Sequence, residues 1–153
     1  MKMSASVFIP ATPQIVWQAL NDPEILRAAL PGCQTFVRIA ENEFRAAASV
    51  AIGPVRSSYS GALTLFDIDP PNSYRVTGSA IGGSDGSAAG SAHIKLTANN
   101  QGTDVNYEIE AVVGGHLALI GQRFIDQAAK KMTEDFFARF SALIVKKASY
   151  AEL

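Results

Sequence analysis

The sequence contains a single cysteine, Cys33, so neither an intramolecular disulfide nor a multi-cysteine metal site is expected. Only 18% of its residues are charged, and 13 Lys and Arg against 14 Asp and Glu leave a formal net charge of -1. This balance lacks the positive excess that nucleic-acid binding normally requires, so DNA and RNA become minor possibilities. The longest apolar run, AVVGGHLALI from Ala111, has about half the length that spans a bilayer. The first residues, MKMSASVFIPATP, are too polar for a secretory signal, and a cytoplasmic protein is expected.

Apolar residues, in contrast, are abundant. They make up 48% of the 153 residues, which is enough for one compact domain with its own core. A Gly/Ser/Ala-rich patch over 78–92 is the one stretch of unusual composition, and it is too short to separate two domains. Residues 1–153 are therefore expected to form a single domain.

Two short helices are predicted near the N-terminus, after a strand in SASVFIPA. Thr-Pro at 12–13 and Asp-Pro at 22–23 each place a capping residue before a proline at the first helical position. They predict helices over 13–20 and 23–30, the second ended by a Pro-Gly pair. The pair resembles a DNA-reading helix-turn-helix in spacing, but its second helix carries one basic residue, Arg27, so a structural role is favoured.

From residue 33 to 113 the hydrophobic period is two, which is typical of antiparallel strands with one buried face. Turn signals, including ENE, GP, DPPN and NNQG, separate these strands, and a sheet of about six or seven is expected. Many inward positions carry small side chains. The expected inward face consists of Phe44, Ala46, Ala48, Val50, Ile52, Tyr59, Gly61, Leu63, Leu65, Tyr74, Val76, Gly78, Ala80, Ala92, Ile94, Leu96, Val105, Tyr107, Ile109, Ala111 and Val113.

After residue 115 the period becomes helical and remains so to the C-terminus. One long amphipathic helix is predicted over 117–143, and its apolar stripe must face the sheet, because nothing else in the chain can cover it. The stripe consists of Leu117, Ile120, Phe124, Ala128, Met132, Phe136, Phe140 and Leu143. The expected fold class is α+β, with a curved antiparallel sheet around a long C-terminal helix.

The small inward residues leave two alternatives: the helix drops close to the sheet, or a cavity remains between them. The lining of such a cavity would be nearly free of ionisable groups, which favours a ligand held by apolar burial. Each of its tyrosines offers a hydroxyl for a carbonyl or hydroxyl head group, or reaches the rim. The candidate ligand-binding residues are Leu30, Ala48, Val50, Tyr59, Leu63, Tyr74, Val76, Ile94, Tyr107, Ile109, Ile120, Phe124, Met132 and Phe136.

The residues capable of chemistry fit ordinary structural roles better than catalytic ones. His93 falls on the outward register, and His116 lies where the long helix starts. Cys33 has no recognisable base partner, and Asp67 and Asp69 precede a Pro-Pro turn that aspartates commonly cap. The glycine patch contains no nucleotide-binding motif, and it predicts a mobile hairpin beside the cavity. No metal site and no catalytic residue are predicted.

Four segments, in their order and spacing, resemble the carbon monoxide dehydrogenase G-subunit family of the START-like (SRPBCC) helix-grip superfamily. They are VWQALNDPEILRAALPGC at 16–33, GPVRSSYSGALTLFDIDPPNSYRVTG at 53–78, the glycine patch that follows, and VGGHLALIGQRFIDQAAKKMTEDFFARF at 113–140. The resemblance covers almost the whole chain. It implies a START-like helix-grip fold and a non-catalytic accessory of molybdenum-containing carbon monoxide dehydrogenase or related molybdenum hydroxylases. Such an accessory helps the enzyme associate with the membrane and handles a lipophilic quinone.

The resemblance also sets the expected ligands and partners. No covalent cofactor is expected. The expected ligand is a bound quinone or lipid, and the expected partner protein is a molybdenum-containing dehydrogenase. A homodimer is compatible with the sequence. Family members often carry an extension beyond the long helix that contributes to membrane attachment. Here Lys146 and Lys147 are the last basic pair, so transient contact with the inner face of the cell membrane is expected.

Two alternatives from other classes stay open. One is a small helix-grip enzyme, of the cyclase or hydrolase type, with Tyr59, Tyr107 or His116 as acid or base. The other is an assembly factor whose cavity is incidental.

Overall fold

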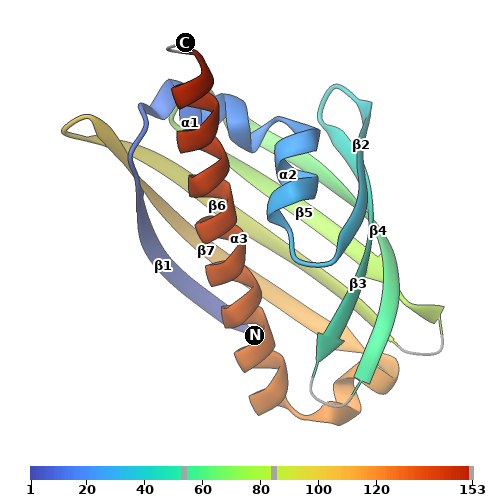
Figure 1. Ribbon diagram of the computed structural model, residues 1–153. Helices are drawn as coiled ribbons and strands as arrows, with labels where there is room; N and C mark the ends of the chain where they lie inside the picture. Colours follow the sequence, from blue (N-terminus) through green and yellow to red (C-terminus); the bar gives the residue numbers. More distant parts are fainter. Residues whose placement is uncertain (53–54, 84–85, 152–153) are drawn as a thin grey trace.

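The computed structural model, which describes residues 1–52, 55–83 and 86–151, has the expected α+β fold. A seven-stranded antiparallel sheet in the order β1-β7-β6-β5-β4-β3-β2 curves around one long helix, α3 (Figure 1). The predicted Gly-Pro turn at 53–54 and positions 84–85 of the glycine patch lie outside the described residues. The strands are β1 (Lys2–Ile9), β2 (Cys33–Ala40), β3 (Glu43–Ile52), β4 (Val55–Asp69), β5 (Ser73–Ile81), β6 (Ser87–Asn99) and β7 (Gly102–Gly114).

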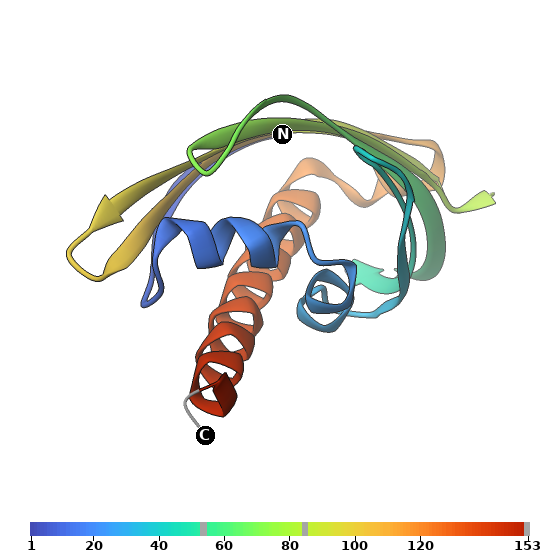
Figure 2. The ribbon, with the colours of Figure 1, turned by 90° about the horizontal axis from the view of Figure 1, so that it is seen from above.

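The predicted short helices are both present, as α1 (Pro13–Leu20) and α2 (Pro23–Ala29). Their caps form as the sequence predicts: Thr12 Oγ1 accepts a hydrogen bond from the Ile15 amide, and Asp22 Oδ1 accepts one from the Glu24 amide. In Figure 2 the sheet forms an arch, and α1, α2 and α3 all lie beneath it. Among the described residues, the helices therefore cover the concave face of the sheet, and no helix covers the convex face.

Strand pairing confirms the predicted inward register. Ala48 lies opposite Tyr59, Gly61 opposite Ala80, and Ala92 opposite Ile109, so that inward residues of neighbouring strands meet side by side. A bulge in β4 beside Asp67, which has φ 50°, ends the regular pairing with β5 at that edge. The bulge lies beyond the last inward residue of β4, so it does not disturb the alternation.

The C-terminal half of α3 packs tightly against the sheet through aromatic side chains. Tyr107 of β7 stacks on Phe137 with their ring centroids 5.1 Å apart, and Phe136 stacks on Phe140 at 5.5 Å. Trp17 of α1 meets Tyr74 of β5 edge to face at 5.3 Å. This half of the space under the sheet is a filled core.

The long helix begins later than predicted. Residues Gly115–Ile120 form a 3-10 helix, η2, and α3 (Gln122–Ala151) starts only after Gly121, whose φ of 105° and ψ of 146° are accessible essentially to glycine alone. This break changes which residues of the first turns face inward. Phe124, predicted to be in the stripe, is 48% exposed, whereas its neighbour Ile125 is buried.

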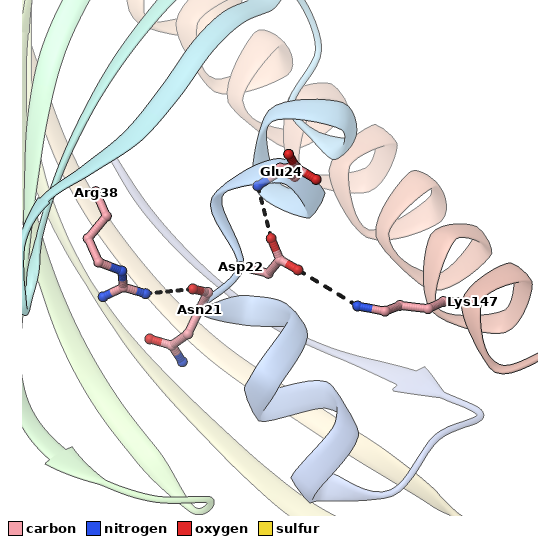
Figure 3. Close-up of polar contacts among 5 residues, drawn as sticks. All are labelled: Asn21, Asp22, Glu24, Arg38 and Lys147. Carbon is pink, nitrogen blue, oxygen red and sulfur yellow. Dashed lines mark hydrogen bonds and ion pairs between the residues drawn. The ribbon is translucent and has the colours of Figure 1, made fainter. Parts of the chain in front are cut away.

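Polar contacts join the α1–α2 corner to α3 and β2 (Figure 3). The Asp22 carboxylate, which caps α2, lies 3.8 Å from Lys147 Nζ in the last turns of α3. Arg38 of β2 donates to the Asn21 carbonyl over 2.7 Å and lies above the Phe44 ring. The corner thereby closes the end of the fold where α3 terminates.

Candidate functional site

A cavity of about 470 Å³ lies between the sheet and the N-terminal half of α3. This volume is within the roughly 300–1,000 Å³ of typical small-molecule sites. The described lining residues are Met1, Val50, Ile52, Tyr59, Ala80, Ala88, Ala111, Val112, Val113, Leu117, Ala118, Gln122, Ile125, Ala128, Ala129 and Met132.

The cavity forms where small side chains of the sheet face small side chains of the helix. Ala80 and Ala88 are direct partners on β5 and β6, Ala111 adds a third methyl group from β7, and Ala128 and Ala129 project from α3. The backbones are held apart by the aromatic residues farther along α3, so the alanines cannot close the gap. Both alternatives left open by the sequence are thus present, a filled core at one end and a cavity at the other.

The far end of the cavity is bounded by η2. Leu117 points inward and is 3% exposed, and it packs against Gly86 at the base of the β5–β6 hairpin. A Cβ on Gly86 would lie 2.7 Å from Leu117 Cβ, so glycine permits this close approach. Ala118 and Gln122 are exposed lining residues and mark the side on which the cavity meets the surface.

The walls are apolar. No Asp, Glu, Lys, Arg or His side chain is among the described lining residues. The polar groups at the rim already have partners, since Gln122 Nε2 donates to Asp126 Oδ1 over 2.7 Å and the Met1 ammonium donates to the Ala111 carbonyl over 2.8 Å. Such a lining favours binding by burial of apolar surface.

One polar group in the wall lacks a partner. Tyr59 lines the cavity, and its hydroxyl oxygen is buried without a hydrogen bond to any described residue. Ser57 Oγ, two residues earlier on β4, is also buried without a hydrogen bond to any described residue, but Ser57 is not among the lining residues. Each unpaired buried hydroxyl costs about 1–3 kcal/mol, so two on one strand need an explanation.

The structure brings together three of the predicted ligand-binding residues: Val50, Tyr59 and Met132 line the cavity. The others lie elsewhere. The filled core and the residues packed against it include Tyr74, Ile94, Tyr107 and Phe136. Four more lie on the inward face without lining the cavity: Ala48, Leu63, Val76 and Ile109. Of the remaining three, Leu30 caps α2, Ile120 ends η2 and Phe124 is exposed.

Sequence reasoning did not identify most of the residues that α3 contributes, Ile125 and Ala129 among them. The signal was Gly121, which interrupts the helical pattern and whose presence indicates a later start for the helix. On the sheet, Ala80 and Ala111 belong to the small inward residues that raised the question of a cavity.

Three groups of the described residues have pKa values above their usual range. Burial raises the pKa of Tyr74, and burial together with the nearby Glu134 carboxylate raises the pKa of Tyr107. Burial also raises the pKa of the Cys33 thiol, whose Sγ donates to the Thr35 carbonyl. A raised thiol pKa disfavours the nucleophilic thiolate.

The remaining candidates for chemistry are not in the cavity wall. His93 lies opposite Glu108 in the sheet, on the outward register as predicted, and His116 is exposed in η2. Asp67 pairs with Arg75 at 3.6 Å, and Asp69 accepts a hydrogen bond from the side chain of Asn72 in the turn. In the described part of the chain no group of three or more potential metal ligands gathers.

No helix within the described ranges is both long enough and apolar enough to cross a bilayer.

Comparisons with known proteins agree with this geometry. The family model of the carbon monoxide dehydrogenase G subunit (CoxG) matches residues 6–145. No curated protein matches the sequence. Among solved structures, a conserved protein from Geobacillus kaustophilus is 32% identical with a TM-score of 0.89, and the match covers 95% of this chain and 96% of that one.

Two more distant structures show the fold alone. A protein from Thermus thermophilus is 14% identical with a TM-score of 0.73, over 96% of this chain and 99% of that one. The Zhui aromatase/cyclase from Streptomyces sp. R1128 is 10% identical with a TM-score of 0.69, over 97% and 95% of the two chains.

Proposed function

Because the chain belongs to the carbon monoxide dehydrogenase G-subunit (CoxG) family, we propose that it is a non-catalytic carrier of a lipophilic ligand, a quinone or another lipid. The family and its helix-grip neighbours support a ligand-binding role. The observation that carries the proposal is the apolar cavity of about 470 Å³ between α3 and the sheet.

Burial of apolar surface is the main favourable contribution to the binding of such a ligand. At about 25 cal/mol per Å², removing roughly 400 Å² of apolar ligand surface from water contributes about 10 kcal/mol. Association costs about 4–15 kcal/mol in lost translational and rotational freedom. The two contributions are of similar size, which is consistent with the reversible binding that a carrier needs to release its ligand.

The partner in this proposal is a molybdenum-containing hydroxylase. The carrier would pass its ligand between this enzyme and the quinone pool of the membrane, in transient contact with the inner face of the cell membrane. The support for this part is family membership. It is tested by isolating the protein with its partners from the native host and identifying them by mass spectrometry.

A helix-grip enzyme is the second candidate. The observation in its favour is the Tyr59 hydroxyl, an acid-base group in the cavity wall without a partner in the described chain. Chemical turnover of a bound ligand by the purified protein, lost in a Tyr59→Phe variant, would support an enzyme. Release of the ligand unchanged supports the carrier.

The direct test of the carrier is mass spectrometry of an organic extract of the purified protein, together with native mass spectrometry of the intact protein. We expect a stoichiometric quinone or neutral lipid. A protein that is empty on purification and remains empty after incubation with quinones would contradict the proposal.

A matched pair of variants on β6 tests the cavity itself. Ala88 lines the cavity, whereas the next residue, Ala89, is exposed on the opposite face. We expect Ala88→Phe to lower quinone binding at least tenfold by filling the cavity, and Ala89→Phe to leave it unchanged. Equal binding by the two variants, with both still folded by circular dichroism, would show that the ligand binds elsewhere.

A further inference from the structure

The unpaired hydroxyls of β4 indicate where in the cavity the polar group of a ligand binds; this inference rests on the proposed function. Tyr59 Oη and Ser57 Oγ are both buried, and neither has a partner within the described ranges. The two residues are separated by one position, so they project from the same face of β4, about 7 Å apart along the strand. That face is the inward one, because Tyr59 lines the cavity.

Packing does not require either hydroxyl. Phe at position 59 would present the same ring to its neighbours, and Ala at position 57 would fit the same buried position without an unpaired oxygen. A buried hydroxyl without a partner destabilises the empty protein. A ligand that supplies the missing partner removes this penalty when it binds.

The surroundings of Tyr59 hold its ring at the wall. Its partner on β3 is Ala48, and on the other side the ring occupies the space that a side chain at position 82 would need. A Cβ on Gly82 would lie 2.5 Å from Tyr59 Cε1. Two small residues therefore flank the ring and leave the adjoining cavity free for a ligand.

The lining also restricts the charge of the ligand. A carboxylate buried near Tyr59 would meet no cationic side chain among the described lining residues, and an unpaired buried charge is strongly disfavoured. The Met1 ammonium is bonded to the Ala111 carbonyl at the β1–β7 edge, and β6 and β5 separate β7 from β4. A neutral oxygen, in contrast, needs only one donor.

We infer that Tyr59 forms the polar end of the ligand site, and that the ligand is a neutral apolar molecule with a carbonyl or hydroxyl oxygen that accepts a hydrogen bond from Tyr59 Oη. Ser57 Oγ is the neighbouring unpaired hydroxyl on the same face of β4. The apolar remainder of the ligand lies along the alanines of α3, towards Gln122 and the surface.

The test compares two probes with the same bicyclic carbon frame and the same short alkyl tail, a 1,4-naphthoquinone, which carries two carbonyl oxygens, and a naphthalene, which carries none. Their affinities are measured by calorimetry for the delipidated full chain, for Tyr59→Phe, and for Ser57→Ala. Tyr107→Phe is the matched control, because Tyr107 belongs to the filled core. We expect Tyr59→Phe to weaken quinone binding about three- to tenfold and to leave naphthalene binding unchanged. Ser57→Ala is expected to have a smaller effect, because Ser57 is not among the lining residues.

Thermal unfolding of the empty variants separates a binding role from a packing role. We expect empty Tyr59→Phe and Ser57→Ala to be at least as stable as the parent, because each removes an unpaired hydroxyl. Equal quinone affinity in the parent and in Tyr59→Phe would overturn the inference while leaving the carrier proposal intact, as would an equal loss for both probes. Tighter binding of a fatty acid than of its methyl ester would also overturn it. A parent protein that binds neither probe would overturn the carrier proposal together with the inference.

Discussion

Side-chain size at single positions decides where this fold is filled and where it is hollow. Phe140 and Val105 are fully buried in the packed half, whereas Ala80, Ala88 and Ala128 leave the other half open. An interior normally packs without voids of this size. The alanines therefore belong to the binding function in our proposal, and the aromatic residues belong to stability.

The buried phenol of Tyr74 makes stability depend on alkaline pH. Its pKa in the folded protein is raised by burial above the usual value of about 10. Above about pH 10 the unfolded chain loses this proton first, so the free energy of unfolding falls as the pH rises, by up to about 1.4 kcal/mol per pH unit. Below the unfolded pKa the contribution is fully present.

We expect Tyr74→Phe to lower this alkaline slope while keeping the edge-to-face contact with Trp17. Urea unfolding at about pH 9 and about pH 11 measures this slope as the change in the free energy of unfolding between the two pH values. The Tyr107→Phe variant should act in the same direction, since burial raises that pKa also. An unchanged slope in both variants would contradict the assignment.

At the scale of elements, the ends of the helices position the walls of the cavity. The Gly121 conformation ends η2 and starts α3, which presents Ile125 and not Phe124 to the sheet. At the opposite end, the Asp22 cap holds α2 against α3 through Lys147 (Figure 3). The cap and the ion pair make separate contributions to the free energy of unfolding.

We expect Asp22→Ala to lower the free energy of unfolding by about 1 kcal/mol, because the Glu24 amide loses its acceptor. Lys147→Ala should cost less than about 0.5 kcal/mol, since the lysine is mostly exposed and the pair is screened by water. Asp22→Asn keeps the cap and removes the charge, so urea denaturation should place it near the parent. A loss in Asp22→Asn as large as that in Asp22→Ala would assign the effect to the charge.

At the scale of the whole molecule, the curved sheet and the α1–α2 corner close one end of the fold and leave the cavity at the other. A ligand that binds only the folded state stabilises it by RT ln(1 + [L]/Kd), about 2.7 kcal/mol at 100 times Kd. For a chain of this size that corresponds to an increase in Tm of roughly 5–10 °C.

We expect a neutral quinone to raise the Tm of the delipidated protein by this amount in a concentration-dependent way, as measured by scanning calorimetry. The Ala88→Phe variant should show no increase, because its cavity is filled. An equal increase in that variant would point to binding outside the cavity.

The sequence by itself determined the features that depend on neighbouring residues. The capped starts of α1 and α2 follow from Thr12 and Asp22 with their prolines, and the inward face follows from the period of two, because alternation along a strand needs no knowledge of the rest of the chain. The four segments that indicated the family also lie in the sequence, and the family model, which matches residues 6–145, confirms the family.

Only the tertiary structure decided which inward residues touch the cavity. Tyr59 and Tyr107 both lie on the inward register, but Tyr107 stacks on Phe137 while Tyr59 lines open space. The difference arises because the aromatic residues of α3 set the distance between helix and sheet along its whole length, and that distance is a property of the assembled layers. Local pattern specifies which side of a strand faces inward, whereas the volume left there depends on residues far away in the chain.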